Sequence, residues 1–263
     1  MEFNDILYTK KDGAARITIN RENVMNAFRP DTVEEMILAL RDADSDSGVG
    51  VIVLAGAGER AFCTGGDQSS HDGKYAGRGV AGMPVEELHN AIRNSRVPVI
   101  ARVQGYAIGG GNVLATLCDL TIASEKAVFG QVGPKVGSVD PGWGTAYLAR
   151  IVGEKKAREI WYLCRRYTAA QAEAMGLVNV VTPHDQLDAT VDAWCAEILE
   201  RSPTAIAIAK RSFNADSDSI GGIGNVGLEA LALFYQTPES KEGAAAFREK
   251  RKPDFRGVRN RGT

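Results

Sequence analysis

The chain has 263 residues, with 31 Lys and Arg against 33 Asp and Glu, so its formal net charge is −2. A charge this close to zero gives no support for a protein that binds nucleic acid over its whole surface. Hydrophobic residues make up 44% and charged residues 24% of the sequence, as in ordinary soluble globular proteins, which excludes wholesale disorder.

The first half of the chain alternates predicted strands and helices. Residues 14–20 alternate apolar and polar side chains, which is typical of a strand with one buried face. A continuous apolar run over 51–55 indicates a strand that is buried on both faces, and residues 99–103 (VIARV) indicate another buried strand. Shorter strands are expected over 120–123 and 128–130, and helices from Pro30 to beyond Leu40, over 84–95 and over 109–117.

The second half is predominantly helical, with glycine and proline marking the breaks between helices. Residues 216–227 are polar and rich in glycine, so we expect a connector there rather than a helix. Near residue 200 the mixed α/β body gives way to helices alone, which divides the chain into a core over 1–200 and a helical region over 201–263. Helices are expected over 145–152, 154–164, 169–175, 186–201, 204–212 and 229–236.

The cysteine spacing and the hydropathy of the sequence argue against a metal site, a disulfide framework and a membrane-spanning segment. The four cysteines are far apart and include no CxxC pair, so neither a metal site nor a disulfide framework is expected. The three histidines are equally scattered. Since no signal-peptide pattern and no apolar stretch of about 18 residues is present, we expect a cytoplasmic protein without a membrane partner.

Glycine-rich turns are the most informative feature of the sequence. Residues 56–61 (GAGERA) match the GxGxxA pattern of dinucleotide-binding proteins, but no long helix pattern follows, and no strand ending in an acidic residue stands about 20 positions later. Gly65-Gly66 and Gly109-Gly110-Gly111 each follow a buried strand. Glycine permits close approach of backbone N–H groups to a ligand, and a helix start adds unpaired donors. Either two tight turns or an oxyanion hole explains this arrangement.

The C-terminal stretch over 248–263 carries seven basic and two acidic residues in an otherwise acidic chain. A solvated tail is one explanation. A site for a phosphate-bearing ligand is the other, because Lys and Arg bind phosphate groups. Nucleic acid is not favoured as a partner, because no aromatic platform or known binding module accompanies the charge.

The segments around the glycine turns resemble the crotonase family, also called the enoyl-CoA hydratase/isomerase family. This resemblance implies an α/β fold, a crotonase-like spiral of ββα units with a C-terminal helical region that makes trimer contacts. Self-association as a trimer or hexamer is implied, as is an acyl-CoA substrate without any further cofactor. The likeness extends from residue 23 to 255 and is carried by 61–67 (AFCTGGD), 104–124 (QGYAIGGGNVLATLCDLTIAS) and 129–160 (FGQVGPKVGSVDPGWGTAYLARIVGEKKAREI).

The family resemblance also assigns roles to single residues. Gly66 and Gly110 correspond to the two backbone N–H donors of an oxyanion hole that stabilises a thioester enolate. Lys250 corresponds to a residue that meets a CoA phosphate across a subunit boundary. The two catalytic glutamates of the hydratases are replaced by Val113 and Gly133. Simple hydration of a double bond is therefore disfavoured, because it needs positioned acid–base groups.

Residues 131–144 (QVGPKVGSVDPGWG) depart from the hydratases and resemble two ring-processing subfamilies. The 1,4-dihydroxy-2-naphthoyl-CoA synthases close a ring by a Dieckmann-type condensation. However, the threonine of their bicarbonate-holding Gln-Thr-Gly is Val132 here, a loop tyrosine is Arg78, and an arginine is Met25. The closer likeness, which includes 60–79, is to the 2-ketocyclohexanecarboxyl-CoA hydrolases, which open a β-keto ring to pimeloyl-CoA.

The subfamily resemblance implies a catalytic set of Asp140, Ser138 and Tyr235, with Asp140 as general base toward water. Without the resemblance, Asp140 before Pro141 is typical of a turn, Tyr235 of an apolar helix, and Asp67 of a group that braces a glycine turn. Contacts with the acyl-CoA are expected from Ala27, Thr64, Gly65, Asp67, Gln68, Tyr75, Tyr106, Gly109, Gly133 and Lys250.

Three functions remain open at this point. The first is a hydrolase that opens the ring of a β-keto acyl-CoA, the second a ring-closing synthase, and the third a non-catalytic acyl-CoA-binding protein on the same scaffold. The sequence favours the hydrolase, because its likeness continues through a loop in which family members usually diverge.

Overall fold

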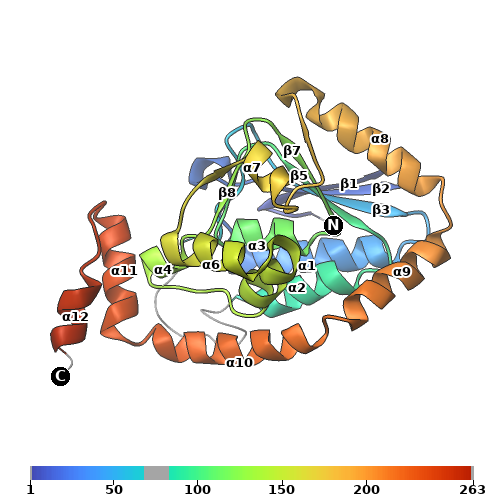
Figure 1. Cartoon of the computed structure of the whole chain (residues 1–263). Coiled ribbons are helices and arrows are strands. Elements are labelled where there is room, and N and C mark those ends of the chain that lie inside the picture. The colour runs from blue at the N-terminus through green and yellow to red at the C-terminus, as the bar shows by residue number, and fades with distance from the viewer. Residues whose placement is uncertain (1, 68–82, 262–263) are drawn as a thin grey trace.

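Two β-sheets and the helices that follow their strands form the body of the chain, seen in a computed structural model that describes residues 2–67 and 83–261 (Figure 1). The larger sheet has the strand order β1-β2-β3-β5-β7-β10 and the smaller one β4-β6-β8-β9. Neighbouring strands are parallel except in the pairs β1–β2 and β8–β9. The strands are β1 (Ile6–Lys11), β2 (Ala14–Ile19), β3 (Val51–Gly56), β4 (Ala61–Cys63), β5 (Val99–Val103), β6 (Tyr106–Ile108), β7 (Leu120–Ser124), β8 (Val128–Gly130), β9 (Tyr167–Thr168) and β10 (Val180–Thr182).

Successive turns of the chain repeat one pattern: a strand in the larger sheet, a strand in the smaller sheet, and then a helix. One turn contains β3, β4 and α2, the next β5, β6 and α3, and the third β7, β8 and α4. The predicted spiral of ββα units is therefore confirmed. The helices up to residue 200 are α1 (Pro30–Ser45), α2 (Val85–Asn94), α3 (Gly110–Leu117), α4 (Gly133–Val136), α5 (Leu148–Val152), α6 (Glu154–Leu163), α7 (Ala169–Ala174) and α8 (Leu187–Leu199).

Helices cover both faces of the larger sheet, with α8 on one face and α1, α2 and α3 on the other (Figure 1). All six residues of β3 are buried as a result. A strand covered on both sides is expected to be predominantly apolar rather than alternating, which is why β3 and β5 were predicted correctly from their apolar residues. The side chains from α8 that pack on this sheet are Leu187, Val191 and Cys195.

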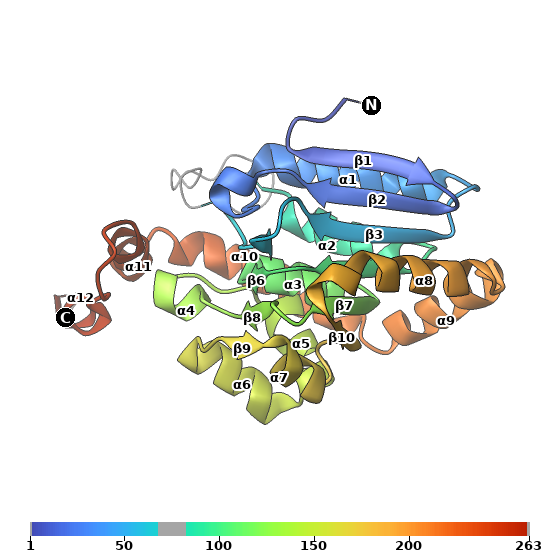
Figure 2. The ribbon, with the colours of Figure 1, turned by 90° about the horizontal axis from the view of Figure 1, so that it is seen from above.

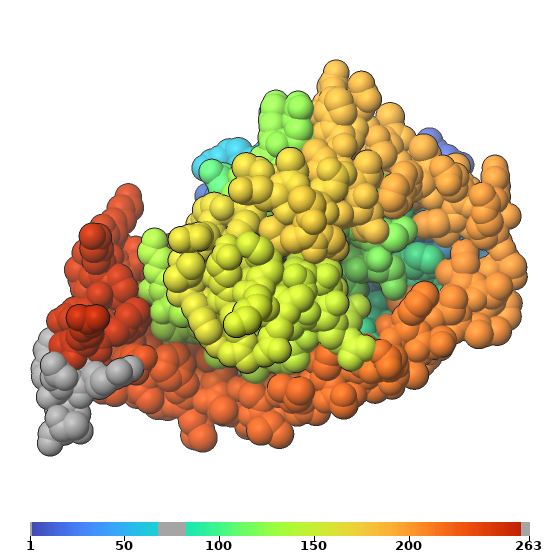
Figure 3. Space-filling model, in the orientation of Figure 1, coloured from blue at the N-terminus to red at the C-terminus, as the bar shows by residue number. Residues whose placement is uncertain are grey.

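The helices after residue 200 extend along one side of the body. Figure 2 and Figure 3 show α10 leading from α9 to α11 and α12, which project from one end of the molecule. Large apolar side chains on α9, α10 and α11 are exposed in the single chain, including Phe213, Leu233 and Phe247. Assembly into a trimer or hexamer stays a prediction. These helices are α9 (Pro203–Ala215), α10 (Ser219–Phe234), α11 (Pro238–Arg248) and α12 (Phe255–Arg261).

The predicted connector over 216–227 is wrong, because most of it belongs to α10. Glycine normally costs about 1 kcal/mol in a helix interior. Here it lets another segment approach: a Cβ at Gly227 would lie 2.3 Å from Pro141 Cβ, and a Cβ at Gly142 would lie 2.6 Å from the Cα of Gly224. Close packing of α10 against the 141–142 loop thus explains its glycine content.

The GxGxxA segment over 56–61 does not open a helix. It forms a turn that leads directly into β4. A Cβ at Gly56 would lie 2.3 Å from the carbonyl oxygen of Phe62, so this glycine serves the close approach of β3 and β4. The dinucleotide-binding alternative therefore lacks the strand–turn–helix geometry that it requires.

Candidate active site

The two glycine turns predicted from the sequence meet where β4 and β6 end. These strands are parallel neighbours, so the turns that follow them lie at the same edge of the smaller sheet. Gly65 has a φ of +89°, and a Cβ there would lie 2.9 Å from the backbone nitrogen of Gly110. A Cβ at Gly110 would lie 2.8 Å from the Phe28 ring. Only glycine allows these backbones to approach so closely.

Both turns line one cavity. The first turn is held by Phe28, whose N–H donates to the Gly65 carbonyl at 2.9 Å and whose carbonyl accepts the Asp67 N–H at 2.8 Å. The second turn opens α3 at Gly110, and the first N–H groups of a helix have no acceptor within it. The structure thus brings together Gly66 and Gly110, the two glycines predicted to form an oxyanion hole.

The cavity has a volume of about 160 Å³ and is lined by elements from both halves of the chain. Apolar side chains such as Met83, Val139 and Leu231 share the lining with the backbone of the glycine turns. The predicted site residues that line it are Thr64, Gly65, Gly66, Gly109, Gly110, Gly133, Ser138, Asp140 and Tyr235.

The three predicted catalytic side chains reach the cavity from two distant segments. Ser138 and Asp140 lie in the loop between α4 and a π-helical turn, Trp143–Tyr147, whereas Tyr235 caps the end of α10. The hydroxyl oxygens of Ser138 and Tyr235 are hydrogen-bonded at 2.8 Å. The Gly144 N–H donates to Asp140 Oδ1 at 3.1 Å. Asp140 therefore lines the cavity and also accepts a hydrogen bond from the π-helical turn, while its predicted role as general base stays a prediction.

Burial makes the Asp140 carboxyl a weaker acid than an ordinary aspartate. It raises the pKa of this carboxyl from the ordinary 3.8 to about 7, and the hydrogen bond from the Gly144 N–H opposes only part of that rise. Burial also raises the pKa of Tyr235, with a smaller contribution from the Asp140 charge, so the phenol stays protonated at neutral pH. A carboxyl with a pKa near 7 exchanges protons under working conditions, as a general base must.

Close backbone packing holds the loop that carries Ser138 and Asp140. Besides the contacts of Pro141 and Gly142 with α10, a Cβ at Gly137 would lie 2.7 Å from the Ser240 carbonyl oxygen of α11. The Ser240 hydroxyl donates to the Gly137 carbonyl at 2.8 Å. Helices after residue 200 therefore position the candidate catalytic loop as well as supplying Tyr235.

Three further polar side chains line the cavity and were not among the predicted site residues: Gln131, Glu86 and Glu229. Gln131 is 1% exposed, and neither its Oε1 nor its Nε2 has a hydrogen-bond partner in the described part of the chain. Gln131 could have been found from its place beside Gly133 in the subfamily motif. Glu86 and Glu229 stand on helical surfaces far apart in the sequence, which carries no signal for them.

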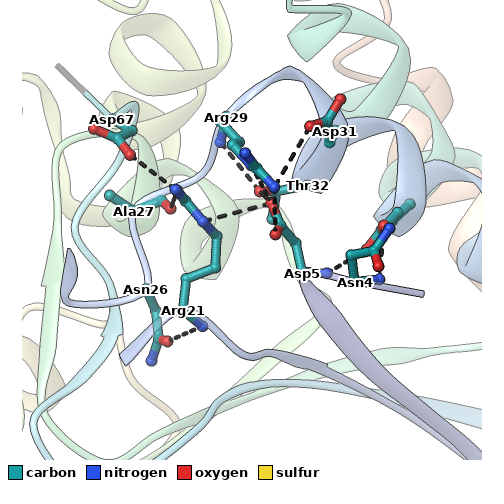
Figure 4. A network of polar contacts seen from close by, with 10 residues as sticks. Asn4, Asp5, Arg21, Asn26, Ala27, Arg29, Asp31, Thr32 and Asp67 are labelled. Carbon is teal, nitrogen blue, oxygen red and sulfur yellow. Dashed lines mark hydrogen bonds and ion pairs between the residues drawn. The ribbon is translucent and has the colours of Figure 1, made fainter. Parts of the chain in front are cut away.

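Asp67 does not line the cavity, although it follows Gly66 directly. Its carboxylate forms an ion pair with Arg21 at 3.0 Å (Figure 4). Arg21 also bonds to the Ala27 carbonyl and approaches Asp5 at 3.4 Å. The side chain thus braces the turn from behind, the structural alternative considered above, and a contact of Asp67 or Ala27 with substrate stays a prediction.

The remaining predicted contacts lie elsewhere. Tyr106 is exposed on β6, and the Arg166 guanidinium lies 5.9 Å from its ring centre. Lys250 is exposed after α11 and does not line the cavity of this chain, so its predicted contact across a subunit boundary is untested. Gln68 and Tyr75 lie outside the described residues.

The basic C-terminal stretch is partly ordered by internal pairing. Arg251 donates to both carboxylate oxygens of Glu242, at 2.6 and 2.9 Å, and residues after Pro253 form α12. Over residues 2–67 and 83–261, no cluster of His, Cys, Asp and Glu is arranged to hold a metal ion. Within the same ranges, none of the helices has the length and apolar character needed to cross a membrane.

Comparisons with known proteins agree with this geometry. The sequence profile of the enoyl-CoA hydratase/isomerase family matches residues 9–259. An enoyl-CoA hydratase from Mycobacterium avium subsp. paratuberculosis is 30% identical over 96% of this chain and 99% of its own, with a TM-score of 0.86. An enoyl-CoA hydratase subunit from Geobacillus kaustophilus is 31% identical over 97% and 98%, with a TM-score of 0.77. A monofunctional enoyl-CoA isomerase from M. smegmatis is 31% identical over 81% and 94%, with a TM-score of 0.71.

Proposed function

Since the chain belongs to the enoyl-CoA hydratase/isomerase family, whose members process acyl-CoA thioesters, we propose that it hydrolyses 2-ketocyclohexane-1-carboxyl-CoA to pimeloyl-CoA. This ring opening is a reverse Dieckmann reaction of anaerobic benzoate and cyclohexanecarboxylate breakdown. The observation that carries the proposal is the Asp140 carboxyl, whose pKa burial raises to about 7 and which lines the same cavity as both glycine turns.

Hydration of a simple enoyl-CoA fits this cavity poorly. At the position of one hydratase glutamate, a Cβ on Gly133 would lie 2.5 Å from the Ser138 carbonyl oxygen and 2.8 Å from the Trp161 ring. A glutamate would not fit there unless the catalytic loop moved. Val113 stands at the other position, fully buried and unable to transfer a proton. Acid–base chemistry therefore has to come from Asp140 and its neighbours.

The first step is the addition of water to the ring ketone. The ionised Asp140 accepts a proton from water as the water oxygen forms a bond to the ketone carbon. The tetrahedral adduct then collapses to a carboxylic acid, and the bond between this carbon and the α-carbon of the thioester breaks. The electron pair of that bond passes into the thioester as an enolate. Because the base must be ionised, the rate depends on the pKa of Asp140.

The enolate is the least stable species in this reaction. The backbone N–H groups of the two glycine turns are the groups that would stabilise its negative charge. The N–H groups of Gly66 and Gly110 would hold the thioester oxygen, an interaction whose loss typically costs about 3 kcal/mol of barrier. Close contact between the two turns keeps these donors fixed, so they need no rearrangement when the charge develops. A rigid pair of donors stabilises the enolate more than it stabilises the neutral thioester.

A proton must then reach the α-carbon. Tyr235 is protonated at neutral pH and hydrogen-bonds to Ser138 at 2.8 Å, so it is the group that we assign to this transfer. The proton that Asp140 took from water then passes to the Tyr235 phenolate, so both groups return to their starting protonation states. In sum, one water is added across one carbon–carbon bond.

A single assay tests the proposal. The purified chain is incubated with 2-ketocyclohexane-1-carboxyl-CoA and no added cofactor, and the CoA esters are resolved by mass spectrometry. We expect pimeloyl-CoA, heavier than the substrate by one water, with kcat/KM rising as the pH passes about 7 and Asp140 ionises.

Two other outcomes would replace the proposal. Conversion of succinylbenzoyl-CoA to 1,4-dihydroxy-2-naphthoyl-CoA, with no ring opening of the first ester, would identify a synthase. Binding of both esters without turnover of either would identify a non-catalytic acyl-CoA-binding protein.

A further inference from the structure

The cavity that holds Asp140 is lined by two additional carboxylates. Glu86 is half-buried in the first turn of α2. Glu229 is exposed on α10 at the same cavity. The lining contributed by the described residues includes no Lys, Arg or His. Three acidic groups from three separate elements therefore face one small space.

A neutral polar group completes the lining. Gln131 is 1% exposed, and its amide oxygen and nitrogen have no hydrogen-bond partner among the described residues. A buried amide is stabilised by any ligand that satisfies it, and an uncharged carbonyl or hydroxyl group does so. A neutral polar acyl group can therefore form hydrogen bonds in this cavity, whereas an anionic acyl group is repelled by the carboxylates that line it.

The proposed reaction converts a neutral acyl group into an anionic one. The substrate carries a ketone, which is neutral, whereas the product carries a carboxylic acid that loses its proton at neutral pH. The charge therefore appears only after the carbon–carbon bond has broken. A carboxylate formed near other carboxylates in a partly dehydrated space is repelled.

We infer that Glu86 and Glu229 make the cavity selective for uncharged acyl groups and drive release of the dicarboxylic product. The inference rests on the proposed ring opening for its role in product release. The charge selectivity itself concerns binding and needs no turnover. It also predicts weak binding of succinylbenzoyl-CoA, whose aryl group carries a free carboxylate.

Two unreactive acyl-CoA probes of equal chain length isolate the charge. Heptanoyl-CoA ends in a methyl group and pimeloyl-CoA in a carboxylate, and calorimetry at pH 8 and low salt gives the dissociation constant of each. We expect the intact chain to bind heptanoyl-CoA about tenfold more tightly than pimeloyl-CoA. In the double variant Glu86→Gln with Glu229→Gln, the ratio falls to about twofold because pimeloyl-CoA binds better. Each single variant gives an intermediate ratio.

A matched control removes the same charge outside the cavity. Glu239→Gln, an exposed position in the first turn of α11, is expected to leave the ratio unchanged. Equal binding of both probes by the intact chain, or a ratio that the double variant leaves unaltered, would overturn the inference. Failure of the ring-opening assay would remove the role in product release, while the binding ratio would still decide the charge selectivity.

Discussion

The polar network around Asp5 and the cavity around Asp140 both contain buried carboxyl groups, but their surroundings differ. Burial would raise the pKa of Asp5, yet hydrogen bonds from Arg29 and Thr32 and the charges of Arg29 and Arg21 outweigh it and lower that pKa. Asp140 receives one backbone N–H, and its pKa rises to about 7. Asp5, with its cationic partners, is held in its charged form, whereas Asp140, which has none within residues 2–67 and 83–261, remains able to exchange a proton.

The two regions meet at the turn that carries Gly65 and Gly66. Asp67, the next residue, belongs to the network through its 3.0 Å ion pair with Arg21 (Figure 4). The glycines themselves line the cavity. The paired charges therefore stabilise the backbone on which the candidate oxyanion hole is built, while Asp140 has no cationic partner among the described residues. The four predictions below separate these two roles.

Asp140→Asn should cause the largest change. Asparagine keeps the size of the side chain and can still accept the Gly144 N–H, but it cannot take a proton from water. We expect turnover of 2-ketocyclohexane-1-carboxyl-CoA to fall by about 10²–10⁴-fold, while the dissociation constant of heptanoyl-CoA changes little. Steady-state kinetics and calorimetry measure the two effects, and a near-normal rate would remove Asp140 from the mechanism.

The same variant has a stability effect with a definite sign. The pKa of Asp140 is about 7 in the fold against an ordinary 3.8, so its contribution to the free energy of unfolding declines as pH rises from about 4 to 7. Asp140→Asn should therefore raise the free energy of unfolding at pH 8 by up to about 4 kcal/mol, a gain that disappears toward pH 4. Asp67→Asn breaks the ion pair with Arg21 and should lower the free energy of unfolding at pH 8. A change of the same sign in both variants would contradict the difference between the paired and the unpaired carboxyl group.

Gly65→Ala tests the turn between the two regions. The new Cβ would lie 2.9 Å from the Gly110 nitrogen at a φ of +89°, so the two turns must separate. We expect turnover per folded molecule to fall by about 100-fold. Gly176→Ala is the control, because its φ of +80° imposes similar strain but the nearest atom lies 3.6 Å away and outside the cavity. Similar kinetics in both variants would show that the turn only shapes the fold.

Arg21→Met should affect stability more than turnover. It removes the cation that contacts both Asp67 and Asp5, and we expect the free energy of unfolding to fall by about 2 kcal/mol. Urea unfolding measures the loss, and turnover at 25 °C should decrease less than tenfold. Lys10→Met, which breaks ion pairs with Asp42 and Asp46 near the surface, provides the control and should cost less. Equal losses would mean that the network has no special structural role.

The sequence alone determined most of the spiral. The buried strand β3 is a continuous apolar run, and β5 is apolar except for Arg102. Thr168 precedes α7 and accepts a side-chain hydrogen bond from the Gln171 N–H, as a capping residue does. The glycine turns were found because glycine is required wherever backbones approach closely. These signals are local, so they can be read without knowing the partners of each residue.

Tertiary structure decided the short strands β4, β6, β9 and β10, the course of α10 and the environment of the cavity side chains. The glycines of α10 indicate a connector until Pro141 is seen packed against Gly227. Asp67 and Asp140 are both aspartates beside glycine or proline, and only their surroundings distinguish a braced carboxylate from one whose pKa is shifted to about 7. Burial and charge pairing depend on segments far apart in the chain, whereas hydrophobic periodicity depends on neighbours, so only the folded chain sets the acidity of Asp140.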